Sequence, residues 1–263
     1  MNEVNKTLFI PLYGKASVSK KGIILEDTNA EEIWQKEQFP LKGKAKSKWL
    51  TYFMAMRAKV FDDWVKQQLE VHAKAAVLHI GCGMDSRFFR LKNVENPWYD
   101  VDFPDVIMER KKYFSETEYY HMLCADASKT AWIEELPDFS CVIVVLEGIS
   151  MYLKNQEVAQ LFSALQAKFP CSYILMDVYT TFGAKASKYK NPINEVGVTR
   201  VYGIDNPTVV AGKDGIRFVK EHSMTPKNLV NELSGFEKFF FSVMFAGNAT
   251  KKIYRLFEYE TER

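Results

Sequence analysis

The sequence predicts an α/β fold in which a mostly parallel, seven-stranded sheet lies between helices and ends in an antiparallel hairpin. From residue 77 onward, short apolar runs alternate with stretches of helical periodicity. These runs are apolar on consecutive residues, which is typical of parallel strands that are buried on both faces. Two β-rich runs near the end of the chain are joined by a short Gly-Asn connection, which is typical of a hairpin.

The first five predicted strands form the parallel part of the sheet, and the last two form the hairpin. The parallel strands are predicted over residues 77–80, 98–101, 119–123, 141–146 and 173–178. The hairpin strands are predicted over residues 238–245 and 252–260. A parallel sheet that ends in such a hairpin is typical of class I methyltransferases, whereas dinucleotide dehydrogenases usually lack the hairpin. The pattern therefore favours the class I methyltransferase fold.

The region before the sheet, residues 1–72, is predicted to be helical. Helices are expected over residues 29–36 and 48–69, because apolar residues recur there at helical spacing. The sequence contains no internal repeat, no low-complexity stretch and no segment that resembles a linker. We therefore expect one domain that spans residues 1–263.

Composition disfavours several classes of partner. A net charge of +2, from 35 basic and 33 acidic residues, gives no overall field that would attract nucleic acid or a membrane. The four cysteines lie far apart without a C-x-x-C pair, which indicates reduced thiols in a cytoplasmic protein. No apolar run resembles a signal peptide or approaches the roughly 20 residues of a membrane span. The four histidines show no metal-ligand spacing, so no metal is expected.

The segment after the first predicted strand carries the strongest local signal. Gly81-Cys82-Gly83 ends a buried strand and precedes a predicted helix. Glycine lets the backbone pass close to a ligand, and the N-terminus of the next helix offers unpaired N–H groups. A plain tight turn is the alternative. Ser86 stands where the dinucleotide-binding fingerprint has its third glycine. This replacement disfavours binding of a dinucleotide pyrophosphate, and it disfavours binding of the methionine tail of S-adenosyl-L-methionine less.

Carboxylates follow the second and third predicted strands. Asp102 ends the second strand, 21 residues after Gly81, where it can accept hydrogen bonds from the ribose hydroxyls of an adenosine-type ligand. Strand alternation turns Asp100, the competing candidate, away from that side. Asp126 follows the third strand and can accept a hydrogen bond from the adenine amine, or it can cap a helix that begins at Ser128.

Glu147 directly follows the fourth predicted strand. A carboxylate at this edge of the sheet suits the cationic sulfonium or the amino group of a methyl donor, whereas a nicotinamide would have little use for it. Tyr152 comes shortly afterwards. It is predicted to line the acceptor side of the site or to pack on the following helix.

Several segments of the chain form a longer pattern together with Arg57 and the nearby Phe61-Asp62. They are Pro-Leu-Tyr-Gly-Lys-Ala-Ser from Pro11, Gly-Cys-Gly-Met-Asp-Ser-Arg-Phe-Phe-Arg from Gly81, Trp-Tyr-Asp-Val-Asp-Phe-Pro-Asp-Val-Ile from Trp98 and Glu-Gly-Ile-Ser-Met-Tyr-Leu from Glu147. In this order they resemble the leucine carboxyl methyltransferase family, in particular its bacterial branch of small-molecule O-methyltransferases of the tetracenomycin type. The resemblance spans residues 8–260.

The resemblance implies an enzyme that uses S-adenosyl-L-methionine as its methyl donor. It implies that Arg57 binds the carboxylate of the donor and that Glu147 faces the methionine end. Lys15 falls near a basic position that contacts the donor in the family.

The resemblance assigns the adenosine end of the donor to the first three strands. It implies that Gly81 and Gly83 shape the donor loop and that Asp102 holds the ribose. Asp126 and Ala127 would contact the adenine.

We therefore expect an S-adenosylmethionine-dependent O-methyltransferase that acts on a carboxylate or hydroxyl of a small-molecule acceptor. An ionised carboxylate needs no general base, and no residue of the sequence stands out as one, which favours carboxyl methylation. One alternative is a nicotinamide-dependent oxidoreductase with a Rossmann-like domain. Another is a methyltransferase-like module that binds without turnover.

The stretch between the fifth strand and the predicted hairpin, residues 179–237, is longer than a crossover needs and is predicted to contain an inserted lid on the acceptor side. Its glycines suit a flap that closes over a site, and its aromatic residues and arginines suit a flat or acidic acceptor. Arg200 and Tyr202 are the predicted acceptor-side residues. A packed helical insertion without contact to the acceptor is the alternative.

Overall fold

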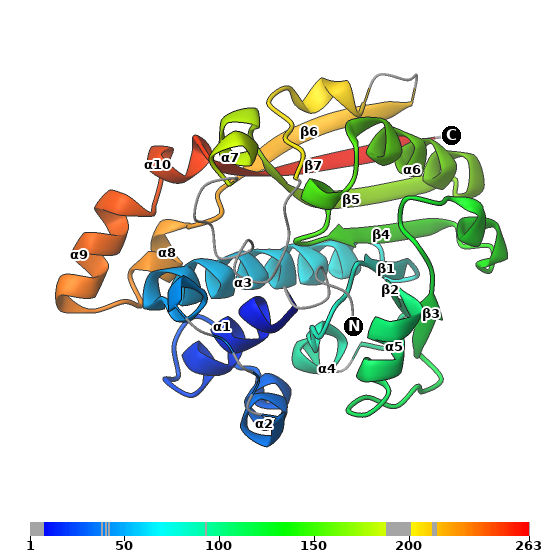
Figure 1. Ribbon diagram of the computed structural model, residues 1–263. Helices are drawn as coiled ribbons and strands as arrows, with labels where there is room; N and C mark the ends of the chain where they lie inside the picture. The colour runs from blue at the N-terminus through cyan, green and yellow to red at the C-terminus, as the bar shows by residue number, and fades with distance from the viewer. Residues whose placement is uncertain are drawn as a thin grey trace.

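The computed structural model describes residues 8–262, apart from residues 38, 40, 42, 93, 188–200 and 212–214. A seven-stranded sheet forms its centre, with the strand order β3-β2-β1-β4-β5-β7-β6 (Figure 1). The strands are β1 (Ala76–Ile80), β2 (Trp98–Asp102), β3 (Tyr120–Cys124), β4 (Cys141–Leu146), β5 (Cys171–Tyr179), β6 (Ile216–His222) and β7 (Tyr254–Glu262). All five predicted parallel strands are therefore confirmed, each within two residues at either end.

The sheet is parallel from β1 to β5, and β7 runs antiparallel to both of its neighbours, β5 and β6. The chain order reverses beside β1, because β2 and β3 extend the sheet on one side and β4 and β5 on the other. Open α/β sheets bind ligands at such a switch point, outside the carboxyl ends of the strands. The mostly parallel sheet with an antiparallel end confirms the predicted fold class.

Helices surround the sheet (Figure 1). Those before it are α1 (Phe9–Ser19), α2 (Thr28–Glu37), the short 3-10 helix η2 (Gly43–Lys46) and α3 (Lys48–Val71). Those within the parallel part are α4 (Arg87–Leu91), α5 (Pro104–Arg110), η3 (Ala131–Glu135), η4 (Ser150–Tyr152) and α6 (Asn155–Lys168). The later ones are α7 (Thr181–Ala186), η5 (Pro207–Val209), α8 (Lys227–Val230), α9 (Gly235–Met244) and α10 (Asn248–Lys251). Among the described residues, no helix is both long and apolar enough to cross a membrane.

Each face of the sheet is covered by an apolar layer. Val77 of β1 and Ile143 of β4 lie in a cluster with Phe61 of α3. The next residues along, such as Leu78, lie in a second cluster with Phe162 of α6. Successive strand residues point to opposite faces, so a strand covered on both faces is apolar throughout. This is the physical reason that the apolar runs predicted the strands.

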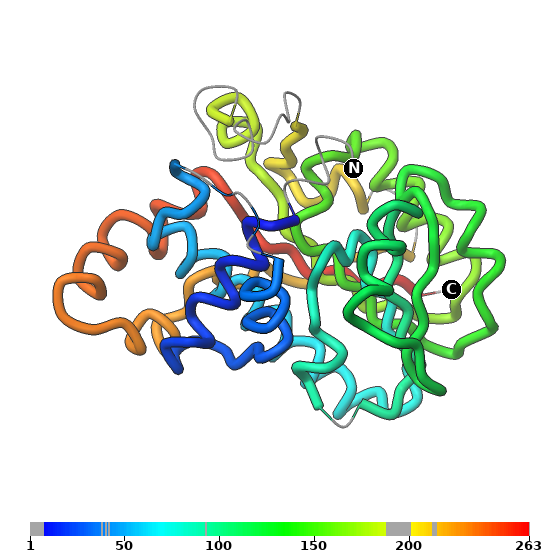
Figure 2. Tube along the Cα trace, turned by 60° about the horizontal axis from the view of Figure 1, so that its bottom comes forward, coloured from blue at the N-terminus to red at the C-terminus, as the bar shows by residue number. Residues whose placement is uncertain are grey.

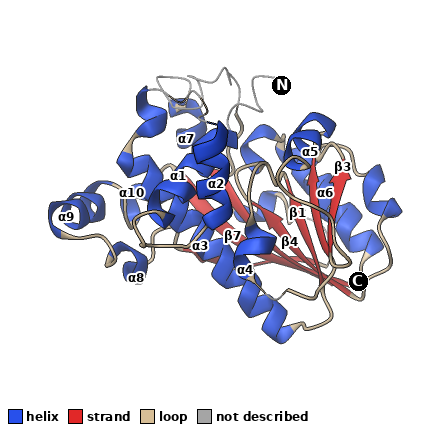
Figure 3. Cartoon of the chain, turned by 90° about the horizontal axis from the view of Figure 1, so that it is seen from below, coloured by secondary structure: helices blue, strands red, loops and turns tan. Residues whose placement is uncertain are grey.

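The segment between β6 and β7, residues 223–253, leaves the sheet and packs on the N-terminal helices. Leu229 and Phe241 lie in an apolar cluster with Val18 of α1 and with Tyr52 and Met56 of α3. Figure 2 shows this orange segment extending away from the sheet, and Figure 3 shows α8 and α9 outside the group of strands.

The predicted strand over residues 238–245 is wrong, because this run forms most of α9, and β7 pairs with β6 instead. Aromatic residues favour strands in general. Here they pair at helical spacing, since the rings of Phe236 and Phe240 lie 5.7 Å apart, as do those of Phe241 and Phe245. Phe241 is also fully buried and contacts Tyr52 edge-on. Packing against α3 therefore overrides the strand propensity.

The range predicted as one insertion, residues 179–237, contains β6, a strand of the sheet. β6 is an edge strand, and apart from Ile216 its side chains are partly or fully exposed. Its sequence is therefore half polar and lacks the apolar run that marks the central strands. Described segments outside the sheet flank β6 on both sides, with α7 and η5 before it and α8, α9 and α10 after it.

Candidate active site

The loop between β1 and α4 passes closely between two other segments at the carboxyl edge of the sheet. Gly81 and Gly83 have positive φ angles of 72° and 52°, which side chains disfavour. A Cβ atom on Gly81 would lie 2.5 Å from Ile149 Cδ1, and one on Gly83 would lie 2.8 Å from Leu8 Cδ2. Both positions therefore favour glycine for their backbone conformation, and Gly81 does so for lack of space as well, since Ile149 Cβ would lie only 2.9 Å from its Cβ.

Asp102 lies at the end of β2, beside this loop. Its carboxylate accepts hydrogen bonds from the backbone N–H groups of Gly83 and Phe103, both at 2.8 Å. Burial raises the pKa of Asp102 above its ordinary value, although these two hydrogen bonds oppose the rise. Asp100 points into the core, where it pairs with Arg110, as strand alternation predicts.

Asp126 follows β3 and lines a cavity of about 400 Å³ together with Asp102. Its Oδ1 accepts hydrogen bonds from the backbone N–H of Ser128 at 2.9 Å and from the Ser128 hydroxyl at 2.7 Å. It therefore closes a turn, and no helix begins at Ser128. Apolar walls of the same cavity come from Phe103, Ile149 and Leu153. Glu157, Lys154 and Ser128 also line this cavity, so its polar groups stand beside apolar walls, a combination that suits a nucleoside.

Arg57 projects from the middle of α3 and is buried. Its Nε donates to Glu147 at 2.9 Å, and its Nη1 donates to Asp177 at 2.9 Å and to the hydroxyl of Tyr254 at 3.0 Å. Burial alone would lower the pKa of Arg57, but Tyr254, Asp177 and Glu147 together hold it above its ordinary value. Its Nη2 donates no hydrogen bond to any described residue and faces Gly148, where a Cβ atom would lie 3.3 Å away.

Lys15 and two arginines of α4 extend these contacts into a buried ion-pair network. Lys15 Nζ lies 3.0 Å from Asp85 Oδ2. Arg87 pairs with Asp62 at 2.8 Å and also with Glu147. The network consists of four cations and five anions: Lys15, Arg57, Arg87, Arg90, Asp27, Asp62, Asp85, Glu147 and Asp177. Its excess of one anion suits a ligand that carries a net positive charge.

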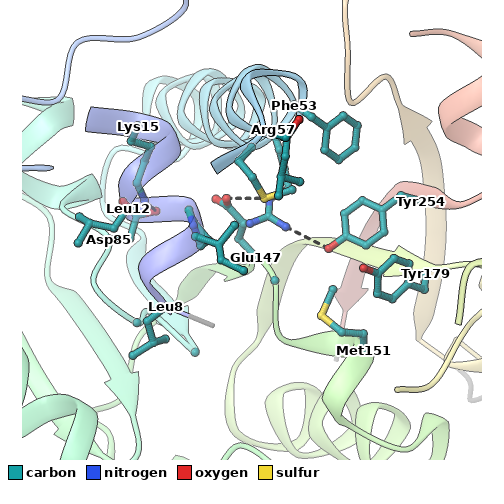
Figure 4. Close-up of a pocket in the computed structure, with 18 of the residues that line it drawn as sticks. Leu8, Leu12, Lys15, Phe53, Arg57, Asp85, Glu147, Met151, Tyr179 and Tyr254 are labelled. Atoms are coloured by element: carbon teal, nitrogen blue, oxygen red, sulfur yellow. Dashed lines mark hydrogen bonds and ion pairs between the residues drawn. The ribbon is translucent and has the colours of Figure 1, made fainter. Parts of the chain in front are cut away.

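A second cavity, of about 620 Å³, lies beside Arg57 and Glu147 and adjoins the smaller one (Figure 4). The two cavities share four lining residues: Leu8, Gly81, Gly148 and Tyr152. In Figure 4, Lys15, Asp85, Leu8 and Leu12 lie on one side of the Arg57–Glu147 pair, and Phe53, Met151, Tyr179 and Tyr254 lie on the other. The space therefore continues from Asp102, past the glycine loop, to Arg57 and beyond it.

Residues 5–166 match the sequence model of the family described as Leucine carboxyl methyltransferase, and this stretch is more than half of the chain. The chain belongs to the leucine carboxyl methyltransferase family. The matched stretch includes Arg57, Asp102 and Glu147, whereas Asp177 and Tyr254 lie beyond it.

Two relatives of this chain are methyltransferases by name. The tetracenomycin polyketide synthesis O-methyltransferase of Streptomyces glaucescens is 28% identical over 238 residues, which cover 89% of this chain and 88% of the relative. An S-adenosyl-L-methionine-dependent methyltransferase of Gibberella zeae is 29% identical over 181 residues, which cover 62% of this chain and 60% of the relative.

Solved structures share the fold. The magnesium protoporphyrin IX methyltransferase of Synechocystis PCC 6803, solved with bound SAH, has a TM-score of 0.51 at 12% identity and covers 89% of this chain and 94% of its own. A DUF574-family protein of Streptomyces avermitilis has a TM-score of 0.57 at 13% identity and covers 90% of each chain. Together with family membership, this confirms the class I fold and an S-adenosylmethionine-dependent methyltransferase, in place of the nicotinamide-dependent alternative.

The predicted acceptor-side residues lie in different places. Tyr152 lies where the two cavities meet. Tyr202 lines the smaller cavity beside Asp102, and its backbone N–H donates to the Met151 carbonyl at 2.8 Å. It therefore lies with the carboxylates and not with the larger cavity. Arg200 lies outside the described residues.

Sequence reasoning missed two of the three residues that hold Arg57, Asp177 and Tyr254. Asp177 lies within β5, and the register pairs Tyr179 of β5 with Tyr254 of β7, which brings the Tyr254 hydroxyl to 2.7 Å from Asp177. A lone aspartate inside an apolar strand is a signal that identifies Asp177, because charged residues are rarely buried without a partner. Tyr254 carries no comparable local signal, since its role depends on the pairing of two distant strands.

His79 is a core residue, as its position in an apolar strand predicts. Its Nδ1 lies 3.1 Å from Asp100 Oδ1, and its Nε2 lies 3.3 Å from Arg87 Nη1. Within the part of the chain that the structure describes, no group of three or more histidine, cysteine, aspartate or glutamate side chains is placed to hold a metal ion.

Proposed function

We propose that this protein transfers a methyl group from S-adenosyl-L-methionine to an oxygen atom of a small molecule, and that the donor binds across the two adjoining cavities. The observation that carries this proposal is the environment of Arg57. Three partners fix the guanidinium, while its Nη2 faces the junction of the cavities. A planar cation held in this way suits the carboxylate of an amino-acid moiety, which it can bind in a directed manner.

The adenosine end of the donor fits the smaller cavity. Asp102 suits the ribose hydroxyls, because a carboxylate has acceptor sites beyond those taken by its two backbone partners. Asp126 and the backbone of Ala127 suit the edge of the adenine. Gly81 and Gly83 keep open a passage that Cβ atoms would fill.

The methionine end of the donor fits the charged part of the larger cavity. When bound, the donor would supply a methyl group on a cationic sulfur; transfer of this methyl to the acceptor oxygen would form a C–O bond, break the C–S bond and leave a neutral thioether. Glu147, held by Arg57 and Arg87, provides a fixed negative charge on that side. Lys15 lines the same cavity and stabilises the glycine loop through Asp85. The protein thus orients the reactants and excludes water.

The lining of the larger cavity favours a carboxylate as the acceptor group. A hydroxyl acceptor must lose a proton during transfer and therefore needs a base. His79, Asp85 and Glu147 line this cavity, but hydrogen bonds and ion pairs within the protein already engage all three. A carboxylate is ionised at neutral pH and needs no base. We therefore expect a methyl ester as the product.

Transfer of an isotopic label tests this function. The protein is incubated with S-adenosylmethionine labelled in its methyl group and with a metabolite extract, and labelled products are found by mass spectrometry before and after mild alkali. An alkali-labile product is expected, because esters hydrolyse and ethers do not. An alkali-stable product would show that the protein methylates a hydroxyl group and not a carboxylate. No labelled product from a protein that binds S-adenosylhomocysteine would favour the non-catalytic module.

A further inference from the structure

The larger cavity has two ends of different chemistry. Lys15, Asp85, Arg57 and Glu147 gather at the end that adjoins the glycine loop. The other end is lined by aromatic rings and thioethers from α3, from η4 and from the segment between β6 and β7. These side chains are Trp49, Phe53, Met54, Met151, Met244 and Phe245. If the donor takes the charged end, as proposed above, the apolar end is left for the acceptor.

Aromatic stacking attaches the outer wall of this end to α3. The rings of Trp49 and Phe245 are stacked with their centroids 5.9 Å apart, and those of Trp49 and Phe240 lie 4.6 Å apart. Lys48 also pairs with Glu237 at 3.0 Å. The segment of residues 223–253, of which only residues 223–237 lie in the predicted lid, therefore bounds the acceptor end.

The side chains at this end indicate the class of acceptor. Aromatic rings stack on flat rings, and methionine sulfur contacts aromatic edges favourably while its flexible chain adapts to their shape. Asp85 and Glu147, the acidic residues among the described lining, are both engaged in ion pairs at the opposite end. An acceptor with a cationic amine would therefore find no acidic side chain among the described residues that line this end.

We infer that the acceptor is an apolar, aromatic molecule and that residues 223–253 select it. This inference rests on the proposed function, because it assigns to the acceptor the space that the donor leaves. The inference describes the part of the acceptor that does not react. Whether the product is an ester or an ether depends only on the reactive oxygen atom.

Binding of simple probes tests the class of acceptor. With the protein saturated by S-adenosylhomocysteine, calorimetry compares 2-naphthoate, acetate and 2-naphthylmethylammonium. We expect 2-naphthoate to bind roughly 100-fold more tightly than acetate, because two aromatic rings leave water. We expect it to bind at least about tenfold more tightly than the ammonium probe, which has no counter-charge at this end. Equal affinity for naphthoate and acetate, or preference for the cation, would overturn the inference.

Two neighbouring residues of α9 provide a matched pair of variants. Met244 is 54% exposed and lines the cavity, whereas Val243 is 60% exposed and does not. Met244→Glu should weaken naphthoate binding roughly tenfold, because it places a charge in the apolar wall. Val243→Glu should leave the affinity for naphthoate unchanged. Equal naphthoate affinities in the two variants would contradict the role of residues 223–253 in selecting the acceptor. If the wild-type protein does not bind S-adenosylhomocysteine, the proposed function itself is refuted. Failure of the proposed function can therefore be distinguished from failure of this inference.

Discussion

Arg57 Nη1 donates a hydrogen bond of 3.0 Å to the hydroxyl oxygen of Tyr254, although 197 positions separate the two residues in the chain. Tyr254 donates in turn to Asp177 at 2.7 Å, and Asp177 accepts a hydrogen bond from Arg57 at 2.9 Å. The three side chains therefore form a closed ring of hydrogen bonds between α3, β5 and β7. The last strand of the sheet fixes the arginine that is proposed to bind the donor.

Tyr254→Phe should weaken the binding of S-adenosylhomocysteine roughly tenfold, because a hydrogen bond to a charged group contributes about 1.5–3 kcal/mol and its loss lets the guanidinium of Arg57 reorient. Isothermal titration calorimetry measures the affinity. Tyr259→Phe is the matched control, since Tyr259 lies on the same strand, is buried, and donates to the Pro207 carbonyl at 3.1 Å, away from the site. Equal affinities in the two variants would remove Tyr254 from the donor site.

Arg57→Lys should also weaken the binding of S-adenosylhomocysteine although it keeps the positive charge. An ammonium group cannot contact Glu147, Asp177 and a ligand carboxylate in the planar arrangement of a guanidinium. Arg217→Lys, which changes an exposed arginine paired with Glu260, should leave the affinity as it is in the wild type. If calorimetry shows that Arg57→Lys binds S-adenosylhomocysteine as tightly as the wild type, Arg57 contributes to the ion-pair network and not to donor binding.

S-adenosylhomocysteine should raise the melting temperature of the wild type, and Asp102→Ala should largely abolish this shift. A carboxylate that accepts hydrogen bonds from ribose hydroxyls contributes about 1.5–3 kcal/mol for each bond. Asp138→Ala removes an exposed carboxylate paired with Lys168 and should keep the full shift. Melting curves with and without ligand test this, and an unchanged shift in Asp102→Ala would exclude Asp102 from the site.

Acid should destabilise the fold through the buried ion-pair network. Burial opposes the ionisation of Asp62, but Arg90 and Arg87 hold its pKa below the ordinary value of 3.8. The pKa of Asp85 lies well below that value, because neighbouring cations outweigh its burial. A pKa that is lower in the folded than in the unfolded protein gives stability that is complete above the unfolded value and is lost as the pH falls through the folded value.

The free energy of unfolding in urea should therefore fall as the pH drops below about 4. Asp62→Asn should flatten this dependence, because the network then loses one of the carboxyl groups whose pKa is lowered in the folded protein. Asp63→Asn changes the adjacent side chain, which is 51% exposed, and should preserve the slope. The same slope in all three proteins would show that the network does not govern acid stability.

The parallel half of the fold could be predicted because each central strand is covered on both faces, which leaves a run of apolar residues such as 141–146. The hairpin could not be predicted in the same way. β6 is a half-polar edge strand, whereas the aromatic run of α9 owes its helical form to contacts with Tyr52 and Trp49, far away in sequence. Local propensity does not contain that information.

The candidate site shows the same division. Gly81, Gly83, Asp102 and Asp126 each lie at the end of a strand or within three residues after it, so their positions at the carboxyl edge could be derived from the strand pattern. Two partners of Arg57, Asp177 and Tyr254, are brought together by the antiparallel register of β5 and β7, which no spacing along the chain reveals.

Calorimetric titration of the wild-type protein with S-adenosylhomocysteine and, separately, with NAD⁺ tests the central claim most directly. Arg57 and Asp102 lie at opposite ends of a continuous space that is proposed to hold the methyl donor. We expect S-adenosylhomocysteine to bind at one site per chain and NAD⁺ to give no saturable heat. Saturable binding of NAD⁺ without binding of S-adenosylhomocysteine would contradict the assignment of this site.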